Sequence, residues 1–210
     1  MSISIVLAIL VTSLATFSSR FLGVVSSEGI KETLIPGLKI IGASTDLAAA
    51  EVELTNFENR EYVFKSIFDE INNFDFIFID TPPTMSSLVQ EGIATSDYYL
   101  IPTKPEFLAI EGVAQAMDFA KKTLKNIPNI NTIFLGVLLN QVETKRSSYE
   151  DFLTELEYLL GDRLFKTKIS HLTELADSPF YGKTVIDFND DSKAKIEVNK
   201  IAEEIIERVG

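Results

Sequence analysis

One aspartate near the middle of the sequence stands where a core strand should end. In FDFIFIDTPPTMSS (residues 74–87), an unbroken run of Phe and Ile leads into Asp80. A charge is rarely buried without a partner, so this carboxylate calls for a cation, a metal ion or backbone amides. Thr81, Pro82 and Pro83 then fix an extended turn, because proline restricts its own φ and the residue before it. The stretch predicts either a plain strand–turn–helix connection or the edge of a nucleotide pocket.

A second polar residue ends another apolar run. Asn140 follows TIFLGVLL (residues 132–139). Its amide side chain offers a donor and an acceptor together, which complements an adenine edge. An asparagine seen alone more often satisfies its own turn. Two polar residues at the ends of two buried strands favour a binding edge more than either residue does alone.

The composition excludes several classes of site. The chain has 210 residues, no cysteine and one histidine, so we expect neither a disulfide scaffold nor a thiolate or histidine-built metal site. Hydrophobic residues make up 46% and charged residues 24%, as in an ordinary globular protein. The net charge of −12 argues against strong attraction of the whole surface to nucleic acid or anionic lipid.

Strand-like and helix-like segments alternate along the chain. Strands are expected over residues 38–44, 74–80, 98–103, 132–140 and 164–169, and helices over 46–56, 60–73, 86–96, 106–125, 147–161 and 195–209. Ser86 or Ser87 is expected to cap the third helix. Strands that are apolar on both faces and separated by helices predict an α/β fold, a mostly parallel sheet with helices on both faces. Such sheets bind ligands beyond the carboxyl ends of their strands, where Asp80 and Asn140 stand.

The first seventeen residues, MSISIVLAILVTSLATF, are apolar enough to suggest a signal peptide or a membrane anchor. However, the purely apolar part, residues 5–11, is far shorter than the about 20 residues of a spanning helix. No Lys or Arg precedes it, although a signal peptide begins with a positive region. A buried strand or helix is therefore the favoured interpretation, and a membrane-tethered or exported protein is the alternative.

From about Pro36 to its end the chain resembles the ParA/Soj group of deviant-Walker partition ATPases, relatives of MinD. The resemblance is carried, in order, by IIGASTDLAAAEVEL, FDFIFIDTPP, YYLIPTKPEFLAIEGVAQ, FLGVLLNQV, LFKTKI and LADSPFYGKTVIDF. It implies a P-loop NTPase of SIMIBI/MinD-like architecture, with ATP and Mg²⁺ as ligands and a cytoplasmic location. It also implies a role in plasmid or chromosome partitioning, that is, ATP-dependent DNA segregation.

The resemblance assigns roles to the polar residues. Asp80 would be the Walker B aspartate, which orients the water shell of Mg²⁺, and residues 81–83 would begin switch II. Asn140 would contact adenine, and Ser170 with His171 would line the base from the other side.

Three kinds of partner are implied by the same resemblance: a second copy of the chain, a ParB-like protein, and DNA bound weakly and without sequence preference. Glu111 and Gly112 would lie near the dimer interface. The expected DNA contacts are Lys145 and Arg146, with Lys166, Lys168 and Lys183 behind them. Given the net charge, the alternative for most of these lysines is solvated surface. No stable membrane association is expected.

The sequence departs from the family at its phosphate-binding loop. Family members begin with a strand and K-G-G-V-G-K-T, whose amides cradle the phosphates and whose lysines neutralise them. Residues 1–37 contain one lysine, Lys31, and no glycine-rich loop. The family's second acidic motif, D-x-D-P-Q, is also absent. Since phosphoryl transfer depends on positioning and charge stabilisation, we expect ATPase activity to be lost or weak.

We therefore expect a single ParA-like domain over residues 1–210, with a divergent apolar segment (1–37) and a family-like portion (38–210). A truncated or degenerate family member accounts for both observations, and a non-catalytic interaction protein is the alternative. In the family, the strand that bears the phosphate loop lies centrally in the sheet. The apolar run ISIVLAILV is expected to fill that place as a substitute strand, because a gap would leave two unpaired edges.

Overall fold

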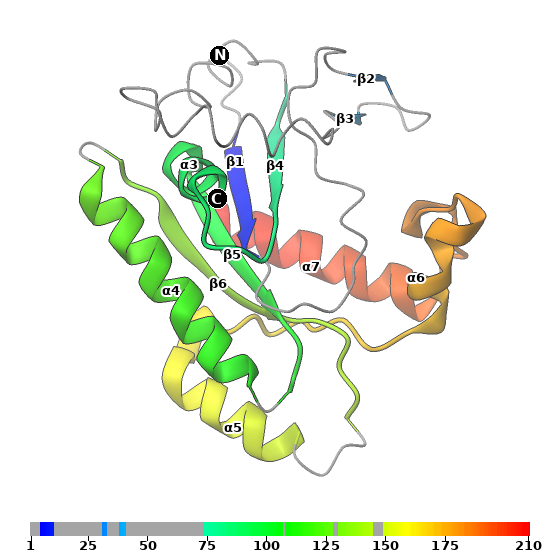
Figure 1. Cartoon of the computed structure of the whole chain (residues 1–210). Coiled ribbons are helices and arrows are strands. Elements are labelled where there is room, and N and C mark those ends of the chain that lie inside the picture. The colour runs from blue at the N-terminus through cyan, green and yellow to red at the C-terminus, as the bar shows by residue number, and fades with distance from the viewer. Residues whose placement is uncertain are drawn as a thin grey trace. The chain divides into compact units, whose positions relative to one another are not determined.

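The computed structural model describes residues 5–10, 31–32, 38–40, 74–106, 108–127, 130–144 and 149–210 (Figure 1). The strands are β1 (Ile5–Leu10), β2 (Lys31–Glu32), β3 (Lys39–Ile40), β4 (Phe76–Thr81), β5 (Tyr98–Thr103) and β6 (Ile133–Leu139). The α-helices are α3 (Ser87–Thr95), α4 (Ala109–Asn126), α5 (Tyr149–Leu160), α6 (Thr173–Asp177) and α7 (Lys193–Val209). Short 3₁₀ helices follow α5 and α6: η2 (Gly161–Arg163), η3 (Ser178–Tyr181) and η4 (Val185–Asp187). The helices expected over residues 46–56 and 60–73 lie outside the described residues.

Four of the strands form one sheet in the order β4-β1-β5-β6, and β2 pairs with β3 in a separate antiparallel ribbon. Strand β1 runs parallel to β4, from Ile5 beside Phe76 to Leu10 beside Thr81. The prediction that the N-terminal apolar run supplies an inner strand of the sheet is therefore confirmed. The residues form a strand, not a helix, and no helix in the described part of the chain is long and apolar enough to cross a membrane.

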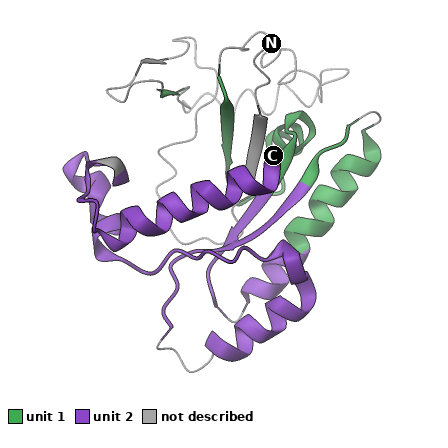
Figure 2. Cartoon of the chain, turned by 180° about the vertical axis from the view of Figure 1, so that it is seen from behind, with its two compact units in different colours: residues 1–99, 115–133 green, residues 100–114, 134–210 purple. Residues whose placement is uncertain are grey.

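The chain divides into two compact units that interleave in sequence (Figure 2). Unit 1 comprises residues 1–99 and 115–133, and unit 2 comprises residues 100–114 and 134–210. Each unit has its own buried apolar residues; Asp80 belongs to unit 1, and Asn140, Ser170 and His171 belong to unit 2.

In unit 1, helix α3 packs directly on strand β4. Leu88, Val89 and Ile93 of α3 are buried. Gly92 faces the strand, where a Cβ atom would lie 3.5 Å from Ile79 Cγ2 and 3.6 Å from Thr81 Cγ2. The end of the helix is fixed by the chain that leads into β6, because the Thr132 hydroxyl donates to the Ile93 carbonyl at 2.8 Å. These contacts hold the carboxyl end of β4, where Asp80 lies.

In unit 2, strand β6 is the centre of the packing. Leu135, Val137, Leu138 and Leu139 are all buried. Gly136 has a φ of +146°, and a Cβ atom there would overlap the carbonyl oxygen of Arg163. Glycine is therefore required, because no side chain fits between β6 and the segment after η2.

The strand expected over residues 164–169 is wrong. Only two isolated parallel bridges form, Val137 with Leu164 and Val142 with Ser170. The Phe165 amide donates to Val137, but the next bond to β6 comes from Ile169 to Leu139, so this segment advances four residues while β6 advances two. The amides of Lys166 and Thr167 donate instead to the carboxylate of Glu204 at 2.9 and 2.8 Å. A side chain of helix α7 thus takes the place of the strand partner.

Candidate functional site

Asp80 is the next-to-last residue of β4 and is paired with Ile9 of β1. Its side chain is half-buried, and burial raises the pKa of its carboxyl above the ordinary value of 3.8. Among the described residues, no hydrogen bond or ion pair reaches this carboxylate. A half-buried carboxylate with a raised pKa and no partner among the described residues is a candidate functional group, because structural carboxylates are usually paired.

The residues after Asp80 lead into α3 as the sequence predicts. Thr81 is buried and closes β4, Pro82 is half-buried and Pro83 is exposed. Ser86 is the N-cap residue of α3, with extended φ and ψ of −93° and 170°. Its hydroxyl does not accept the usual capping bond and is buried without a hydrogen-bond partner in the described structure. The capping position was predicted correctly, although the capping hydrogen bond is not formed.

Asn140 terminates β6 in unit 2. Its backbone amide donates to Thr103 at 2.8 Å, and its side-chain oxygen accepts the Gln141 amide at 2.9 Å. Gln141 has a φ of +54°, so the chain turns sharply at this point. The side-chain oxygen of Asn140 therefore satisfies the backbone of its own turn, as the alternative in the sequence analysis predicts. Its Nδ2 group donates no hydrogen bond within the described part of the chain.

Ser170 and His171 lie on the segment beside Asn140. The Ile169 amide donates to Leu139 and the Val142 amide donates to Ile169, both at 2.9 Å, so the two segments flank each other on either side of Asn140. His171 continues this pairing through its amide, and its Nδ1 lies 3.0 Å from a carboxylate oxygen of Glu143. The structure thus brings together the three residues that were expected to contact a base.

Ser170 is held by a residue that the sequence reasoning missed. Glu197 of α7 accepts the Ser170 amide at 2.8 Å on one carboxylate oxygen and the Ser170 hydroxyl at 2.7 Å on the other. The side chain of Glu197 is only 15% exposed. A glutamate in an amphipathic C-terminal helix gives no local signal of this role, since its partner lies 27 residues earlier.

A second carboxylate of α7, Glu204, was missed for the same reason. Burial raises the pKa of Glu204, but hydrogen bonds from the backbone amides of Thr167 and Lys166 and from the side chains of Thr167 and Arg208 outweigh that effect. The pKa of Glu204 therefore lies below its ordinary value. Arg208 donates to Glu204 and also to the carbonyls of Leu135, Asp162 and Leu164. Its guanidinium carbon lies 4.1 Å from the centre of the Phe165 ring. This network anchors α7 to β6 and to the segment that carries Ser170.

The side chains expected to contact DNA are partly engaged by other groups of the protein where the structure describes them. Lys145 and Arg146 lie outside the described residues. Lys168 donates to the Tyr149 hydroxyl at 2.8 Å and lies over its ring, so it packs within unit 2. Lys183 lines an open hollow of about 470 Å³ together with Glu174, Asp177, Ser178, Tyr181, Asp187, Phe188, Asn189, Asp191 and Ser192. Its neighbours there include four carboxylates, which would oppose a phosphate.

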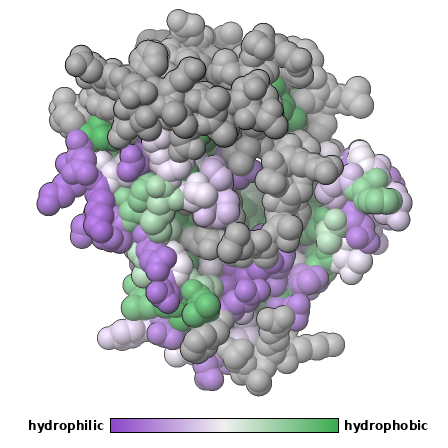
Figure 3. Space-filling model, viewed as in Figure 1, coloured by the Kyte–Doolittle hydropathy of each residue, from purple (hydrophilic) through white to green (hydrophobic). Residues whose placement is uncertain are grey.

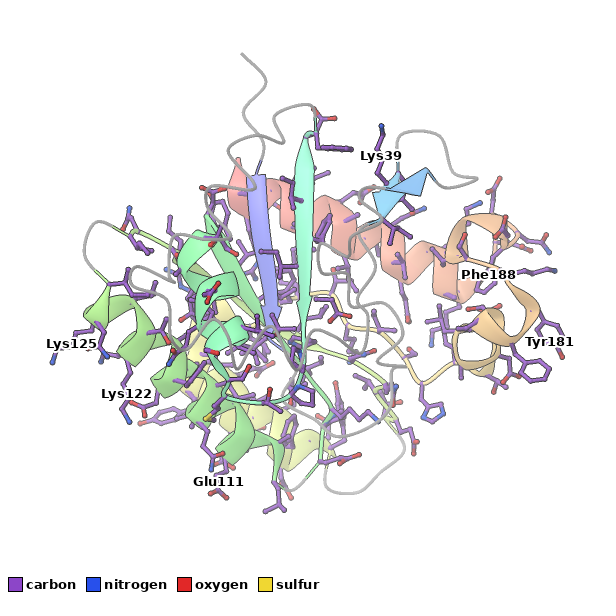
Figure 4. All side chains as sticks on the ribbon, turned by 45° about the horizontal axis from the view of Figure 1, so that its top comes forward. Lys39, Glu111, Lys122, Lys125, Tyr181 and Phe188 are labelled. Atoms are coloured by element: carbon purple, nitrogen blue, oxygen red, sulfur yellow. The ribbon has the colours of Figure 1, made fainter. Side chains whose placement is uncertain are left out.

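One carboxylate of this hollow, Glu174, holds the start of helix α7 in place. Glu174 accepts the Ala194 amide at 3.1 Å and the Ser192 hydroxyl at 2.9 Å at the start of α7. Phe180 and Tyr181 project from η3 and are 89% and 70% exposed. Figure 3 shows hydrophobic surface over the α6–η3 segment, and Figure 4 labels Tyr181 at its outer side.

Glu111 and Gly112, the residues expected near a dimer interface, lie in the first turn of α4. Glu111 is exposed and is favourably placed against the partial positive charge of the helix N-terminus (Figure 4). Leu108, just before the helix, is 69% exposed.

The donors for a metal ion are few. The described residues contain no cluster of three or more His, Asp or Glu side chains that could hold a metal ion. A single half-buried carboxylate such as Asp80 fits Mg²⁺ bound through its water shell, since Mg²⁺ keeps several waters and is completed by substrate phosphates. The chemistry of Asp80 therefore agrees with a shared magnesium site and not with a dedicated protein cage.

Comparison with known protein families shows to which family the chain belongs. A family model described as "AAA domain" matches residues 12–133, which is more than half of the chain. The chain belongs to this family. Within it, the chain is a member of the ParA/Soj group, as the resemblance indicated.

Similar curated proteins support this placement. The sporulation initiation inhibitor protein Soj of Bacillus subtilis is 29% identical over 177 residues, which cover 84% of this chain and 70% of that protein. The chromosome-partitioning ATPase Soj of Treponema pallidum is 28% identical over 182 residues, covering 86% and 72%. The chromosome partitioning protein ParA of Caulobacter vibrioides is 26% identical over 180 residues, covering 84% and 67%.

Solved structures confirm the fold. The ATP complex of a McdA variant from Cyanothece superposes with a TM-score of 0.74 at 15% identity, over 98% of this chain and 85% of that one. A plasmid partition protein of Borrelia burgdorferi bound to AMPPNP gives 0.67 at 18% identity, over 97% and 84%. Cobyrinic acid a,c-diamide synthase of Mycobacterium smegmatis, with a bound ATP analogue and magnesium, gives 0.62 at 23% identity, over 84% and 82%. The chain has the P-loop NTPase fold of ParA and MinD.

Proposed function

We propose that this chain is a plasmid- or chromosome-partitioning protein of the ParA/Soj group that retains a base-binding edge but has lost efficient ATP hydrolysis. It would act by association, with a second copy of itself and with a ParB-like protein. Its expected location is the cytoplasm, which stays a prediction.

The observation that carries this proposal is the sequence just after β1. Strand β1 ends at Leu10, beside Thr81 and next to Asp80, where the family has its phosphate loop. Residues 11–22, VTSLATFSSRFL, contain no glycine and no lysine, and their one cation, Arg20, comes ten residues after the end of the strand. They supply neither the glycines for a close backbone approach nor the paired lysines that hold a triphosphate in the family.

The electrostatics point the same way. A nucleoside triphosphate carries up to four negative charges, and the chain has a net charge of −12. Asp80 adds a carboxylate at the strand end, so Mg²⁺ would have to offset most of the repulsion. Losing the positioning and charge stabilisation of the phosphates should abolish hydrolysis instead of slowing it modestly.

The base-binding part rests on unit 2. Asn140, Ser170 and His171 lie on two paired segments, and Asn140 Nδ2 donates no hydrogen bond to any residue that the structure describes. A hydrogen-bonding edge of this size supports only weak binding of a base or nucleoside, with a dissociation constant of roughly 1 mM. In this protein Asp80 would hold Mg²⁺ through water only when phosphates complete the site.

A hydrolysis assay tests the proposal. With Mg-ATP, we expect no release of phosphate above background, and the variant Asp80→Ala should be indistinguishable from the wild type because there is no catalysis to remove. A measurable rate that drops on Asp80→Ala would show that another segment has replaced the phosphate loop. The chain would then be a catalytic partition ATPase, which is the second candidate function.

A further inference from the structure

Two aromatic side chains project into solvent from the short helix η3. Phe180 and Tyr181 are both largely exposed, and Tyr181 lies at the outer side of the segment (Figure 4). Their rings contact each other edge to face, with centroids 5.7 Å apart and an angle of 79° between the ring planes. Burial of such rings is favourable, so two adjacent rings that the fold leaves exposed on one surface turn indicate an interaction surface.

The turn that carries the two rings has a fixed shape. Pro179 restricts φ at the start of η3, and the Ser178 hydroxyl donates to the Leu175 carbonyl at 3.1 Å. Gly182 then adopts the left-handed conformation, with a φ of +62°, and its amide donates to the Pro179 carbonyl at 3.2 Å. Because this backbone is already held in place, little conformational entropy is lost when a partner binds the rings.

The hollow that Tyr181 lines is negatively charged. Its lining contains four carboxylates, and Lys183 is the one cation among the lining residues. Asp177 and Asp191 are exposed, and neither carboxylate accepts a hydrogen bond or forms an ion pair with a residue that the structure describes. This part of unit 2 therefore combines aromatic faces with an excess of negative charge, the two features that attract a guanidinium group.

We propose that an acidic–aromatic surface, formed by Asp177, Phe180, Tyr181 and Asp191, docks an arginine-bearing segment of a partner protein. A guanidinium plane stacks on an aromatic ring and also pairs with a carboxylate through two parallel hydrogen bonds. One arginine can therefore use both kinds of group. None of these four residues belongs to the base-binding edge, so the inference holds whether or not the chain binds nucleotide.

The charge of the surface disfavours other occupants. The phosphates of nucleic acid or of anionic lipid would be repelled by the carboxylates. A second copy of the chain has a net charge of −12 and would bring the same acidic surface, so like charges would oppose its docking. A cationic segment is attracted, and this attraction should fall as the salt concentration rises.

The experiment titrates the full chain at low salt with a defined probe, a blocked peptide of four Gly-Arg repeats. The amide resonance of Gly182, next to the rings, reports binding at the surface. We expect a dissociation constant of roughly 0.3 mM. The same peptide with lysine in place of arginine has an equal charge but no plane that can stack, so it should bind at least about threefold more weakly.

Two double variants separate the contributions of the rings and of the carboxylates. Phe180→Ala with Tyr181→Ala removes both rings, and Asp177→Asn with Asp191→Asn removes both charges. Each double variant should weaken binding of the arginine peptide about fivefold. All four side chains are exposed, so the substitutions should leave the fold intact.

Matched controls come from helix α5. Tyr158 is 88% exposed, so Tyr158→Ala removes an exposed ring elsewhere on the protein. Glu155 and Glu157 are exposed as well, and Glu155→Gln with Glu157→Gln changes the net charge as much as the aspartate double variant does. Both controls should bind the arginine peptide within about twofold of the wild type.

Four outcomes would overturn the inference. The Gly182 resonance would not move at millimolar peptide, or the glutamate control would weaken binding as much as the aspartate double variant, which would mean that the peptide follows only the net charge. Equal affinities for the arginine and lysine peptides would show that the rings contribute no stacking. A Gly182 shift that depends on protein concentration without peptide would show that a second copy of the chain occupies the surface.

Discussion

Ile9 of β1 is paired in parallel with Asp80 of β4, one residue before both strands end at Leu10 and Thr81. Strand β1 is an inner strand of the sheet, and in the proposed function it takes the place of the strand that bears the phosphate loop in the ParA/Soj group. Residues 11–22, which follow β1 in the sequence, contain no lysine and no glycine. In the proposed function, the sheet is kept and the means of holding phosphate are lost.

Asp80→Asn should make the protein more stable at neutral pH. Burial raises the pKa of the native carboxyl, so ionising it costs more in the native than in the unfolded state. The native state therefore has its full stability below the unfolded value of 3.8 and loses part of it as the pH rises through the native pKa. Asparagine stays neutral, so the variant should have a higher Tm at pH 7 and no advantage below pH 3.8.

The control for this prediction is Asp75→Asn, an exposed aspartate that immediately precedes the same strand. It should not change Tm at either pH. If Asp80→Asn lowers Tm at pH 7, the carboxylate has a stabilising cation partner, and the account of Asp80 is wrong.

Restoring the phosphate loop should restore nucleotide chemistry. Replacing residues 11–17, VTSLATF, by KGGVGKT keeps the chain length and places the loop directly after β1. If β1 and Asp80 retain the family geometry, the graft should bind Mg-ATP at least about 100-fold more tightly than the wild type, a gain of about 3 kcal/mol from two lysines and the loop amides.

Combining the graft with Asp80→Ala is the control, since it should remove any hydrolysis that the graft gains. A folded graft that binds Mg-ATP no better than the wild type would show that the end of β1 does not correspond to the family's phosphate site.

Arg208→Ala should be strongly destabilising. It leaves the buried carboxylate of Glu204 without its cation and removes bonds to three carbonyls, and breaking a buried pair from one side costs about 3 kcal/mol or more. Urea denaturation would measure the loss. Lys200→Ala removes an exposed cation from the same helix and should change the free energy of unfolding by less than about 0.5 kcal/mol.

DNA binding should be weak at physiological salt. The net charge is −12, and Lys183 shares its hollow with four carboxylates. If Lys145 and Arg146 are the contacts, replacing both by alanine should reduce the slope of log affinity against log salt by about two, whereas Lys183→Ala should change it little. Tight binding of random-sequence duplex that survives the double substitution would point to a different basic face.

One other group of lysines could supply such a face. Lys122 and Lys125 point outward from α4 (Figure 4), and Lys121 on the same helix is also exposed. The Nζ of Lys122 lies 2.6 Å from a carboxylate oxygen of Asp118, so this carboxylate competes with a phosphate for the lysine.

The sequence predicted those parts of the fold that depend on local pattern. The run YYLIPT forms β5 over the expected residues, and the N-terminal apolar run forms β1. Asp80 is the next-to-last residue of β4 and Asn140 directly follows β6, within one residue of the expected strand ends, because a polar residue after an apolar run is a local signal.

The remainder depends on contacts between residues far apart in sequence. The segment 164–169 has the composition of a strand, but Glu204, 37 residues beyond Thr167, takes its amides. Glu197 and Ser170 meet across 27 residues. No periodicity or composition encodes such a pair, so the partner of a backbone amide in an irregular segment could not be read from the sequence.

The most direct test of the central claim compares Mg-ATP with adenosine as ligands of the wild-type chain, with affinities measured by the shift of the His171 resonance. If the base edge remains and the phosphate site is lost, the two dissociation constants should agree within about threefold, both at roughly 1 mM. If Mg-ATP binds more than about 100-fold more tightly than adenosine, the phosphates are held by the protein, and the claim that this chain has lost its phosphate site is wrong.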